Sequence, residues 1–417
     1  MPTEPQVELL QRRIVRSLTL GQALGGFGFG STLSVGALMA FELTGTAAWS
    51  GAAATMATLG AASIAIPLAN LADRRGRRVA LASGAALAIL GAAGMILAAG
   101  TRVFAIELVA LFLLGSASAV SLQARFAAND LPIKKNRGRD LSLVVWATTI
   151  GAMTGPNLIG PGETLGMALG MPHLSGPFAL TIFAQLASTT VFWFGLRPDP
   201  LLWAQRIAKE KRAEGVKRPR KSIVQTLAVV RANPVIAYSV LSIALSHMVM
   251  VSVMAMTPAH LDSQGHGLSA VGFTISLHVA GMYAFSPVFG WLSDRIGSRP
   301  VVALGIFVLI ASLTVSAIGQ FDFTAVVVGL FLLGLGWSAA TVAGSALLSS
   351  AVGIDDKPEV QGLSDSVMNL TGAFGGAIAG TILTLVGFSG LNFLAMVPVA
   401  LILLLTGSQL RRTEQKK

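Results

Sequence analysis

Apolar segments of about twenty residues account for most of this 417-residue chain. Each is long enough to cross about 30 Å of hydrocarbon as a helix. A helix also satisfies its own backbone polar groups, which hydrocarbon cannot do. Only 12% of the residues are charged, about half the fraction found in soluble domains. We therefore predict an all-α integral membrane protein with twelve transmembrane helices, at 17–40, 50–72, 79–100, 104–126, 141–162, 177–197, 235–258, 268–292, 300–319, 324–351, 361–385 and 389–410.

The distribution of basic residues predicts the orientation. If the N-terminus is inside, every one of the 30 Lys and Arg residues except Arg102 falls on the inner side, as the positive-inside rule requires. We expect a multi-pass protein of the cytoplasmic membrane with both termini in the cytoplasm. The net charge of +11 then faces the anionic inner leaflet, so the partner of this charge is the bilayer and not nucleic acid. We expect a monomer.

Several chemistries are excluded by what the sequence lacks. There is no cysteine, which removes disulfides, thiolate metal sites and cysteine nucleophiles. No phosphate-binding loop is present, and no pair of residues suited to catalysis lies in the apolar segments. The first apolar segment is too long for a cleaved signal and is predicted to be retained. We predict neither an enzyme nor a cofactor, apart from a transported ion.

A short motif occurs twice, each time between two apolar segments. Leu71-Ala-Asp73-Arg74-Arg75-Gly76-Arg77-Arg78 returns as Leu292-Ser-Asp294-Arg295-Ile-Gly297-Ser-Arg299, and the Leu-Phe-Leu-Leu-Gly run at 111–115 returns at 330–334. The longest internal polar stretch lies between the copies. The repeat predicts two six-helix halves, 1–198 and 234–417, joined by a basic cytoplasmic loop at 199–233 and ending in a short cytoplasmic tail.

This arrangement resembles the major facilitator superfamily. The resemblance implies a secondary active transporter that works by alternating access. It also implies a gating role for the hairpin residues Asp73, Arg74, Gly76, Arg77, Asp294, Arg295 and Gly297. An Asp near a helix N-terminus and beside an Arg gains from the helix dipole and from charge pairing. The chain departs from the family pattern at Ala69, where the second copy keeps Gly290. The alternative is that the basic cluster only anchors the topology.

Two further features of the first half bear on coupling. Gly151, Gly155, Pro156 and Gly160 lie in the predicted helix 141–162 and resemble the Gly-Pro motif of proton-linked exporters, although close helix packing explains them equally well. Glu107 lies near the outer end of the predicted helix 104–126. An ionisable residue within a membrane segment is a candidate for coupling, whereas the alternative is a carboxylate that caps the helix or faces the outer water.

Histidine and methionine side chains share helix faces in the second half. His247, Met250 and Met254 are spaced i, i+3 and i+7, and His278 and Met282 are spaced i and i+4. Imidazole and thioether are suitable ligands for soft metals such as Cu(I). The pattern resembles the CcoA-type copper importers of this superfamily, which implies that Met250, Met254, His278 and Met282 relay metal. Alternatively, the methionines fill gaps in packing and the histidines make structural hydrogen bonds.

The cargo therefore stays open among three hypotheses. The Met/His pattern favours uptake of copper or another soft transition metal. The Gly-Pro run favours proton-linked export of drugs or organic metabolites. Uptake of an organic nutrient such as a vitamin is the third.

Overall fold

The computed structural model describes residues 4–45, 50–131, 137–154, 159–210, 222–266 and 268–414. Within these ranges the chain is helical and contains no strand, which confirms the predicted all-α class. The helices are α1 (Glu4–Thr44), α2 (Ser50–Thr101), α3 (Phe104–Ala127), α4 (Arg137–Thr154), α5 (Ile159–Ala168), α6 (Gly176–Gly195), α7 (Pro200–Glu210), α8 (Ile223–Ala232), α9 (Pro234–Ser263), α10 (Leu268–Tyr283), α11 (Ser286–Ile296), α12 (Ser298–Ile318), α13 (Phe323–Ala351) and α14 (Lys357–Glu414).

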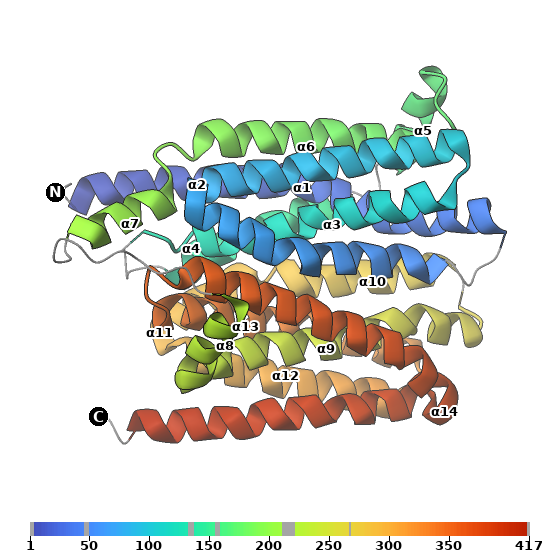
Figure 1. Cartoon of the computed structure of the whole chain (residues 1–417). Coiled ribbons are helices and arrows are strands. Elements are labelled where there is room, and N and C mark those ends of the chain that lie inside the picture. The colour runs from blue at the N-terminus through green and yellow to red at the C-terminus, as the bar shows by residue number, and fades with distance from the viewer. Residues whose placement is uncertain are drawn as a thin grey trace. The chain divides into compact units, whose positions relative to one another are not determined.

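Two of these elements are helical hairpins. Within α2 the chain turns back at Gly76 (φ 88°, ψ 167°), and within α14 it turns back at Gly387 (φ 72°, ψ −178°) (Figure 1). Both backbone conformations are essentially restricted to glycine. Each of the two elements therefore supplies two of the predicted transmembrane helices. In the part of the chain that is described, eight helical stretches are long and apolar enough to cross a membrane, and both hairpins are among them.

Two of the predicted transmembrane helices each correspond to two helices of the described structure. The predicted helix 268–292 consists of α10 and α11, because Pro287 near the start of α11 has no N–H to donate and its ring clashes with the preceding turn. The predicted helix 141–162 consists of α4 and α5, with residues 155–158 between them outside the described part. The polar stretch 199–233 contains two short helices, α7 and α8.

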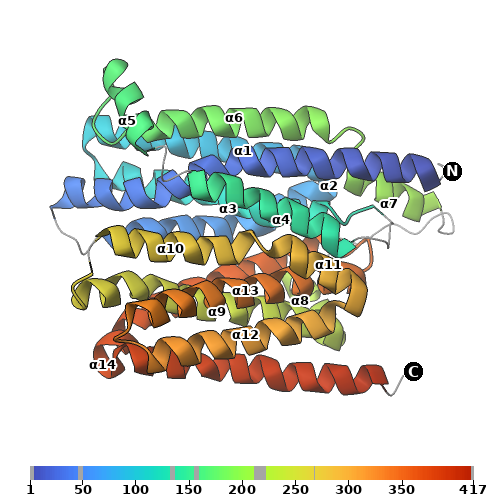
Figure 2. The same cartoon turned by 180° about the vertical axis from the view of Figure 1, so that it is seen from behind.

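The chain divides into two compact units, and each exchanges a short segment with the other half of the sequence. The first unit comprises Met1–Lys134, Leu143–Thr226 and Gly353–Ser366. Within it α1 packs along α6 (Figure 2), and α2 packs against α3 and α6. Side chains such as Leu81 and Phe192 form one apolar cluster, and Met95 and Phe178 belong to another.

The second unit comprises Lys135–Ser142, Leu227–Val352 and Val367–Lys417. Its central element is α13, which packs against α9, α10, α11 and α12. This contact on many sides explains why α13 is buried along most of its length. A helix in this position can present side chains to three or four neighbours at once.

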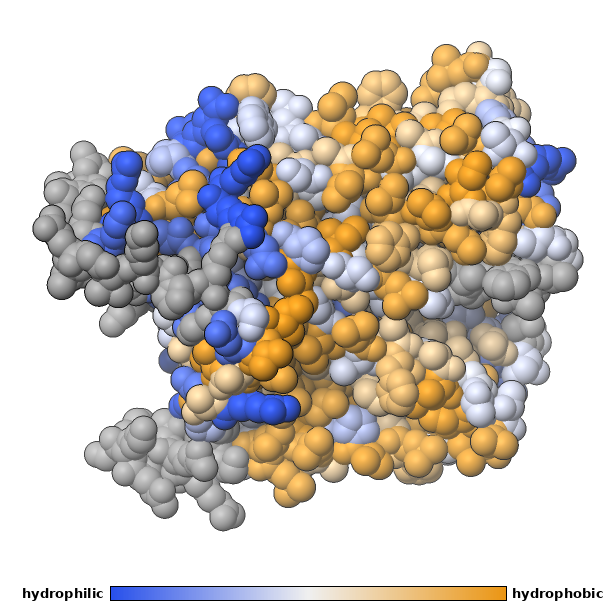
Figure 3. All heavy atoms as spheres, viewed as in Figure 1, coloured by the Kyte–Doolittle hydropathy of each residue, from blue (hydrophilic) through white to orange (hydrophobic). Residues whose placement is uncertain are grey.

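The outer surface of the first unit has the hydropathy pattern of a membrane protein. Figure 3 shows hydrophobic residues along most of α6, whereas hydrophilic residues gather near α7. On α7 the apolar side chain of Leu201 is buried against Ala72 and Ala80 of α2. The end of the unit that carries the first hairpin motif is therefore the polar end.

Alanine substitutions at the two hairpin glycines should separate backbone strain from steric collision. At Gly387 an added Cβ would have no neighbour within 4 Å, whereas at Gly76 it would strike the Asp199 carboxylate. We expect Gly387→Ala to lower the free energy of unfolding by about 1–3 kcal/mol, the usual cost of such a conformation, and Gly76→Ala to lower it more. Thermal unfolding in detergent measures both. Gly272→Ala is the control, because an added Cβ at this helical glycine would meet nothing within 4 Å. Equal losses of stability in Gly76→Ala and Gly387→Ala would contradict the predicted collision with Asp199.

Candidate functional site

Arg77 of the first hairpin motif is fully buried and bonded on all sides. Its Nε lies 2.7 Å from an Asp130 oxygen, and its terminal nitrogens donate to Gln123 at 3.3 Å and to Gln361 at 2.5 Å. A buried guanidinium is stable only when it is paired and hydrogen-bonded in this way. The sequence predicted pairing of Arg77 with an Asp of its own motif. The carboxylate that Arg77 binds in the structure is Asp130, which the sequence reasoning missed.

A second buried ion pair lies in the same unit. Arg125 in the last turn of α3 donates to Asp365 of α14 at 2.6 Å, and both side chains are at most 2% exposed. Nearby, the Lys357 ammonium donates to the Asn129 carbonyl at 2.9 Å. These contacts explain why residues 353–366 belong to the unit formed by the first half of the sequence. Charged residues within apolar segments were the available signal, but their pairing was not predictable.

Ala69 stands where the family pattern has glycine, and it faces a glycine on α14. A Cβ added to Gly362 would lie 2.4 Å from the Ala69 Cβ, so the small residue at this crossing is on α14 and not on α2. In the second copy the pairing involves two glycines, because a Cβ on Gly290 would meet the Gly138 carbonyl at 2.4 Å. The departure from the family pattern therefore preserves the close helix approach.

The turn of the first motif is held by a carboxylate outside the motif. Asp199 accepts from the Arg78 amide at 2.8 Å and from the Leu201 and Leu202 amides at 3.1 Å, so it joins the hairpin turn to the N-terminus of α7. Asp73 accepts from the Gln205 amide group of α7 at 3.1 Å. Of the predicted gating residues in this copy, Arg74 is exposed.

The second motif places its carboxylate at the start of a helix. The Asp294 oxygens accept from the Gly138 amide at 2.7 Å and the Arg139 amide at 2.9 Å, where the first N–H groups of α4 lack partners within the helix. Gly297 turns the chain between α11 and α12 with φ 92°. Arg295 lies over the Trp291 ring at 4.8 Å. The predicted interaction of a motif Asp with a helix N-terminus is thus seen for Asp294.

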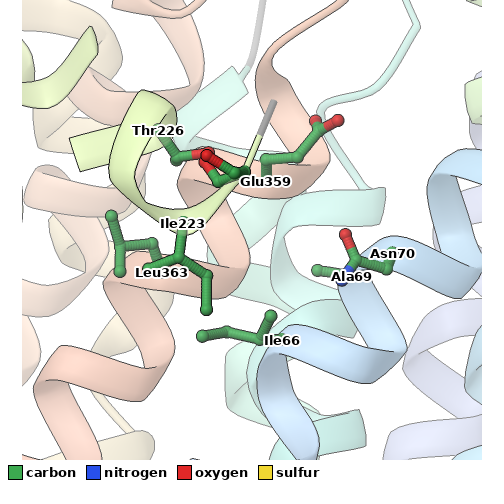
Figure 4. A pocket seen from close by; sticks show the side chains of 8 residues that line it. Ile66, Ala69, Asn70, Ile223, Thr226, Glu359 and Leu363 are labelled. Atoms are coloured by element: carbon green, nitrogen blue, oxygen red, sulfur yellow. The ribbon is translucent and has the colours of Figure 1, made fainter. Parts of the chain in front are cut away.

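A pocket of about 210 Å³ lies between α2, α14 and the start of α8. Figure 4 shows Ile66 and Asn70 of α2, Ile223 of α8, and Glu359 and Leu363 of α14 around it. The start of α8 is therefore part of the same polar end as the first motif. The lining combines apolar side chains with the polar residues Asn70, Ser222, Thr226 and Glu359.

Aromatic and imidazole rings meet in the second unit. The Trp337 indole N–H of α13 donates to Nδ1 of His247 on α9 at 3.1 Å, and the two ring centroids are 5.9 Å apart. Tyr283 of α10 lies edge-on to Trp337 with a centroid separation of 5.8 Å. Trp337 is 4% exposed, whereas His247 and Tyr283 are half-buried. The sequence reasoning singled out His247 but missed both of its aromatic neighbours.

The predicted soft-metal ligands are only partly brought into position. His278 is fully buried, and its Nδ1 donates to the Leu330 carbonyl of α13 at 2.8 Å, while its Nε2 has no hydrogen-bond partner in the described part of the chain. Met250 and Met282 are buried and Met254 is half-buried. Among the described residues, no group of three or more His, Cys, Asp or Glu side chains could hold a metal ion.

Glu107 is fully buried three residues after the start of α3. Neither of its carboxyl oxygens has a hydrogen-bond partner among the residues that the structure describes. Ala110, Leu111 and Leu114 lie on the same helix face and belong to an apolar cluster. The structure therefore does not support the alternative that Glu107 faces the outer water.

The predicted packing motif of the helix at 141–162 is only partly described. A Cβ on Gly26 of α1 would lie 3.0 Å from the Gly151 Cα, so Gly151 does allow a close helix crossing. Gly155 and Pro156 lie outside the described residues. At Gly160 an added Cβ would meet no described atom within 4 Å. The packing role of Gly160 stays a prediction.

The helices, the buried ion pairs and the apolar surface together define a multi-pass membrane protein. The family model of the Major Facilitator Superfamily matches residues 18–277 and 240–417, and the chain belongs to this superfamily of secondary transporters.

The chain is similar to two curated bacterial transporters. It is 33% identical over 399 residues to the uncharacterized MFS-type transporter YdeG of Bacillus subtilis, with 94% of this chain and 91% of the relative covered. It is 29% identical over 401 residues to the riboflavin transporter RfnT of Brucella anthropi, with 94% of each covered. The crystal structure of the human organic anion transporter MFSD10 has the same fold, with a TM-score of 0.75, 16% identity, and coverage of 95% of this chain and 99% of that chain.

The Arg125–Asp365 pair supports a prediction about stability. Removing one partner of a buried ion pair leaves an uncompensated charge, so we expect Arg125→Met to lower the free energy of unfolding by about 3–5 kcal/mol. Arg125→Met combined with Asp365→Leu should recover most of that loss, because the pair is replaced by apolar side chains of similar size. Thermal unfolding of the purified variants measures both. A double variant no more stable than the single variant would contradict this account.

Proposed function

We propose that this transporter carries a small organic solute with a flat aromatic ring. The observation that carries the proposal is the cluster of His247, Trp337 and Tyr283 on three helices of one unit. Flat conjugated solutes stack well on aromatic rings, and each such contact contributes about 1–3 kcal/mol. Small-molecule sites generally combine apolar and aromatic walls with a few placed polar groups.

The hydrogen bond within the cluster defines what His247 can offer. Because an indole N–H only donates, Nδ1 of His247 accepts, and in the neutral ring the proton is then on Nε2. Nε2 lies on the edge of the ring beside Gly372 of α14, and in this proposal it turns to donate to a carbonyl or ring nitrogen of the cargo when the cargo binds. Trp337 fixes this tautomer and also supplies its own ring face.

Riboflavin is the first cargo to test. One relative that matches across almost the whole chain is named a riboflavin transporter, and riboflavin combines a flat conjugated ring system with carbonyl and ring-nitrogen acceptors. Both features complement the cluster. The direction of transport is uptake in this proposal, and efflux of organic metabolites or drugs is the alternative outcome of the same assay.

For the mechanism, we propose that the two hairpin motifs hold the cytoplasmic side shut during alternating access. The contacts of Arg77 with Gln361, of Arg125 with Asp365 and of Asp294 with the N-terminus of α4 tie segments of one sequence half to helices of the other. All three must break for those segments to separate. The Arg125→Met, Asp365→Leu double variant tests this gate as well, because it should stay folded while its transport rate changes.

Trp337 provides the test of the cargo. Whole cells that express the chain should accumulate radiolabelled riboflavin above the vector control, alongside a panel of other flat heterocycles, sugars and copper. We expect Trp337→Ala to raise the half-saturating concentration about tenfold, which corresponds to about 1.4 kcal/mol, at an unchanged amount of protein in the membrane. Trp193→Ala, at an exposed tryptophan, is the matched control.

Two results would contradict the proposal. If no flat aromatic solute is moved in either direction, the cargo class is wrong. If such a solute is moved and Trp337→Ala behaves as wild type, the cargo class stands and the site is wrong.

Copper or another soft metal is the second candidate cargo. The observation that favours it is the unpartnered Nε2 of buried His278, with Met282 one turn further along α10. If copper is the cargo, copper accumulation measured by mass spectrometry rises on expression. His278→Ala should then abolish the rise, and His266→Ala in the outer loop should leave it unchanged. Accumulation that does not depend on copper would remove this candidate.

A further inference from the structure

Glu107 is a buried carboxyl group for which the structure offers no partner. Its side chain is 0% exposed, and both oxygens are without a hydrogen-bond partner within the described part of the chain. The buried carboxylates Asp130 and Asp365, in contrast, are each paired with an arginine. Glu107 therefore calls for a different physical explanation.

The charged groups at this end of the first unit are engaged elsewhere. Among the described helices, α1 and α2 make the most extensive contacts with α3. At this end they carry Glu42 and, directly after α2, Arg102, which pair with each other at 3.1 Å on the surface. Their other charged residues lie at 4–16 and 73–78, at the opposite end. Glu163 of α5 pairs with His173, which follows α5, at 2.7 Å.

The surroundings of Glu107 are apolar. Its face of α3 continues through Ala110, Leu111 and Leu114, which pack with Met95 and with Phe178 of α6. A carboxylate buried in such a place without donors is strongly disfavoured, whereas the neutral carboxyl is tolerated. Glu107 is nevertheless only about 4.5 Å along the helix axis from the first residue of α3. A small opening of this end would bring water to it.

We propose that Glu107 is a proton-binding site that controls packing at the outer end of the first unit. When this end opens, water hydrates the carboxylate. A proton from the outer solution then forms an O–H bond with it, and the neutral side chain can enter the apolar cluster and let the end close. Reopening returns the proton to water. The proposal requires that the chain is a transporter, which the family shows, and does not depend on the aromatic cargo.

The absence of cysteine allows a direct test without any cargo. Ala110→Cys would place a thiol in the closed cluster, and Val103→Cys would place one at an exposed outer position. Cells that carry either variant are treated with a membrane-impermeant thiol reagent at several external pH values. The labelling rate at 110 is divided by that at 103 to correct for the reagent, and the same ratio in Glu107→Gln shows how much of the pH dependence comes from the buried thiol itself.

The expected result is a labelling ratio that rises with external pH when Glu107 is present. Glu107→Gln, which mimics the neutral carboxyl, should hold the ratio low at every pH. Glu42→Gln, a carboxylate of the exposed pair at the same end, should keep the wild-type profile. A ratio that is constant with pH in the wild type, or one that rises as steeply in Glu107→Gln, would overturn the proposal.

Infrared spectroscopy of the purified full-length protein gives a second measurement in case Ala110→Cys does not fold. The carbonyl band of a protonated carboxyl group should be present at neutral pH. It should lose a component in Glu107→Gln and be unchanged in Glu42→Gln. A wild-type spectrum that Glu107→Gln does not alter would also overturn the proposal. Both measurements can succeed or fail whichever solute is transported.

Discussion

The cost of burying an unpaired charge in an apolar environment governs most of this structure. It keeps most charged residues out of the long apolar helices. Where charges are buried despite this cost, they are paired: Arg77 with Asp130, and Arg125 with Asp365. Glu107 is the described exception, and its lack of a partner is the reason that it attracts a functional explanation.

The two copies of the hairpin motif use related sequences for different contacts. In the first copy a buried arginine is the centre, bonded to Gln123 of α3, to Asp130 just after α3 and to Gln361 of α14. In the second copy the aspartate is the centre, bonded to the backbone at the start of α4. Both arrangements attach a short segment from one half of the sequence to helices of the other. These are the contacts that break in the proposed gate.

Much of the fold could be predicted because the hydrophobicity and charge of each segment follow from its own residues. In the described part of the chain every predicted membrane segment contains helix, and the turns at Gly76 and Gly387 fall between predicted helices. The break before α11 was missed, although Pro287 marked it. Within the candidate site, Asp294 and Gly290 behave as the repeat indicated. Asp130, Gln361, Asp365 and Asp199 were missed as members of the contacts, since nothing local shows which distant charge a buried arginine will meet.

The sequence by itself determined that the chain is a helical membrane protein of repeated design, because segment length, apolarity and the bias of basic residues act without tertiary context. Tertiary structure alone decided which charges pair, that His247 meets Trp337 while His278 bonds to a backbone carbonyl, and that Glu107 is left without a partner. The physical reason is distance: these interactions act over a few ångströms between residues far apart in the chain, so they exist only after the helices have packed.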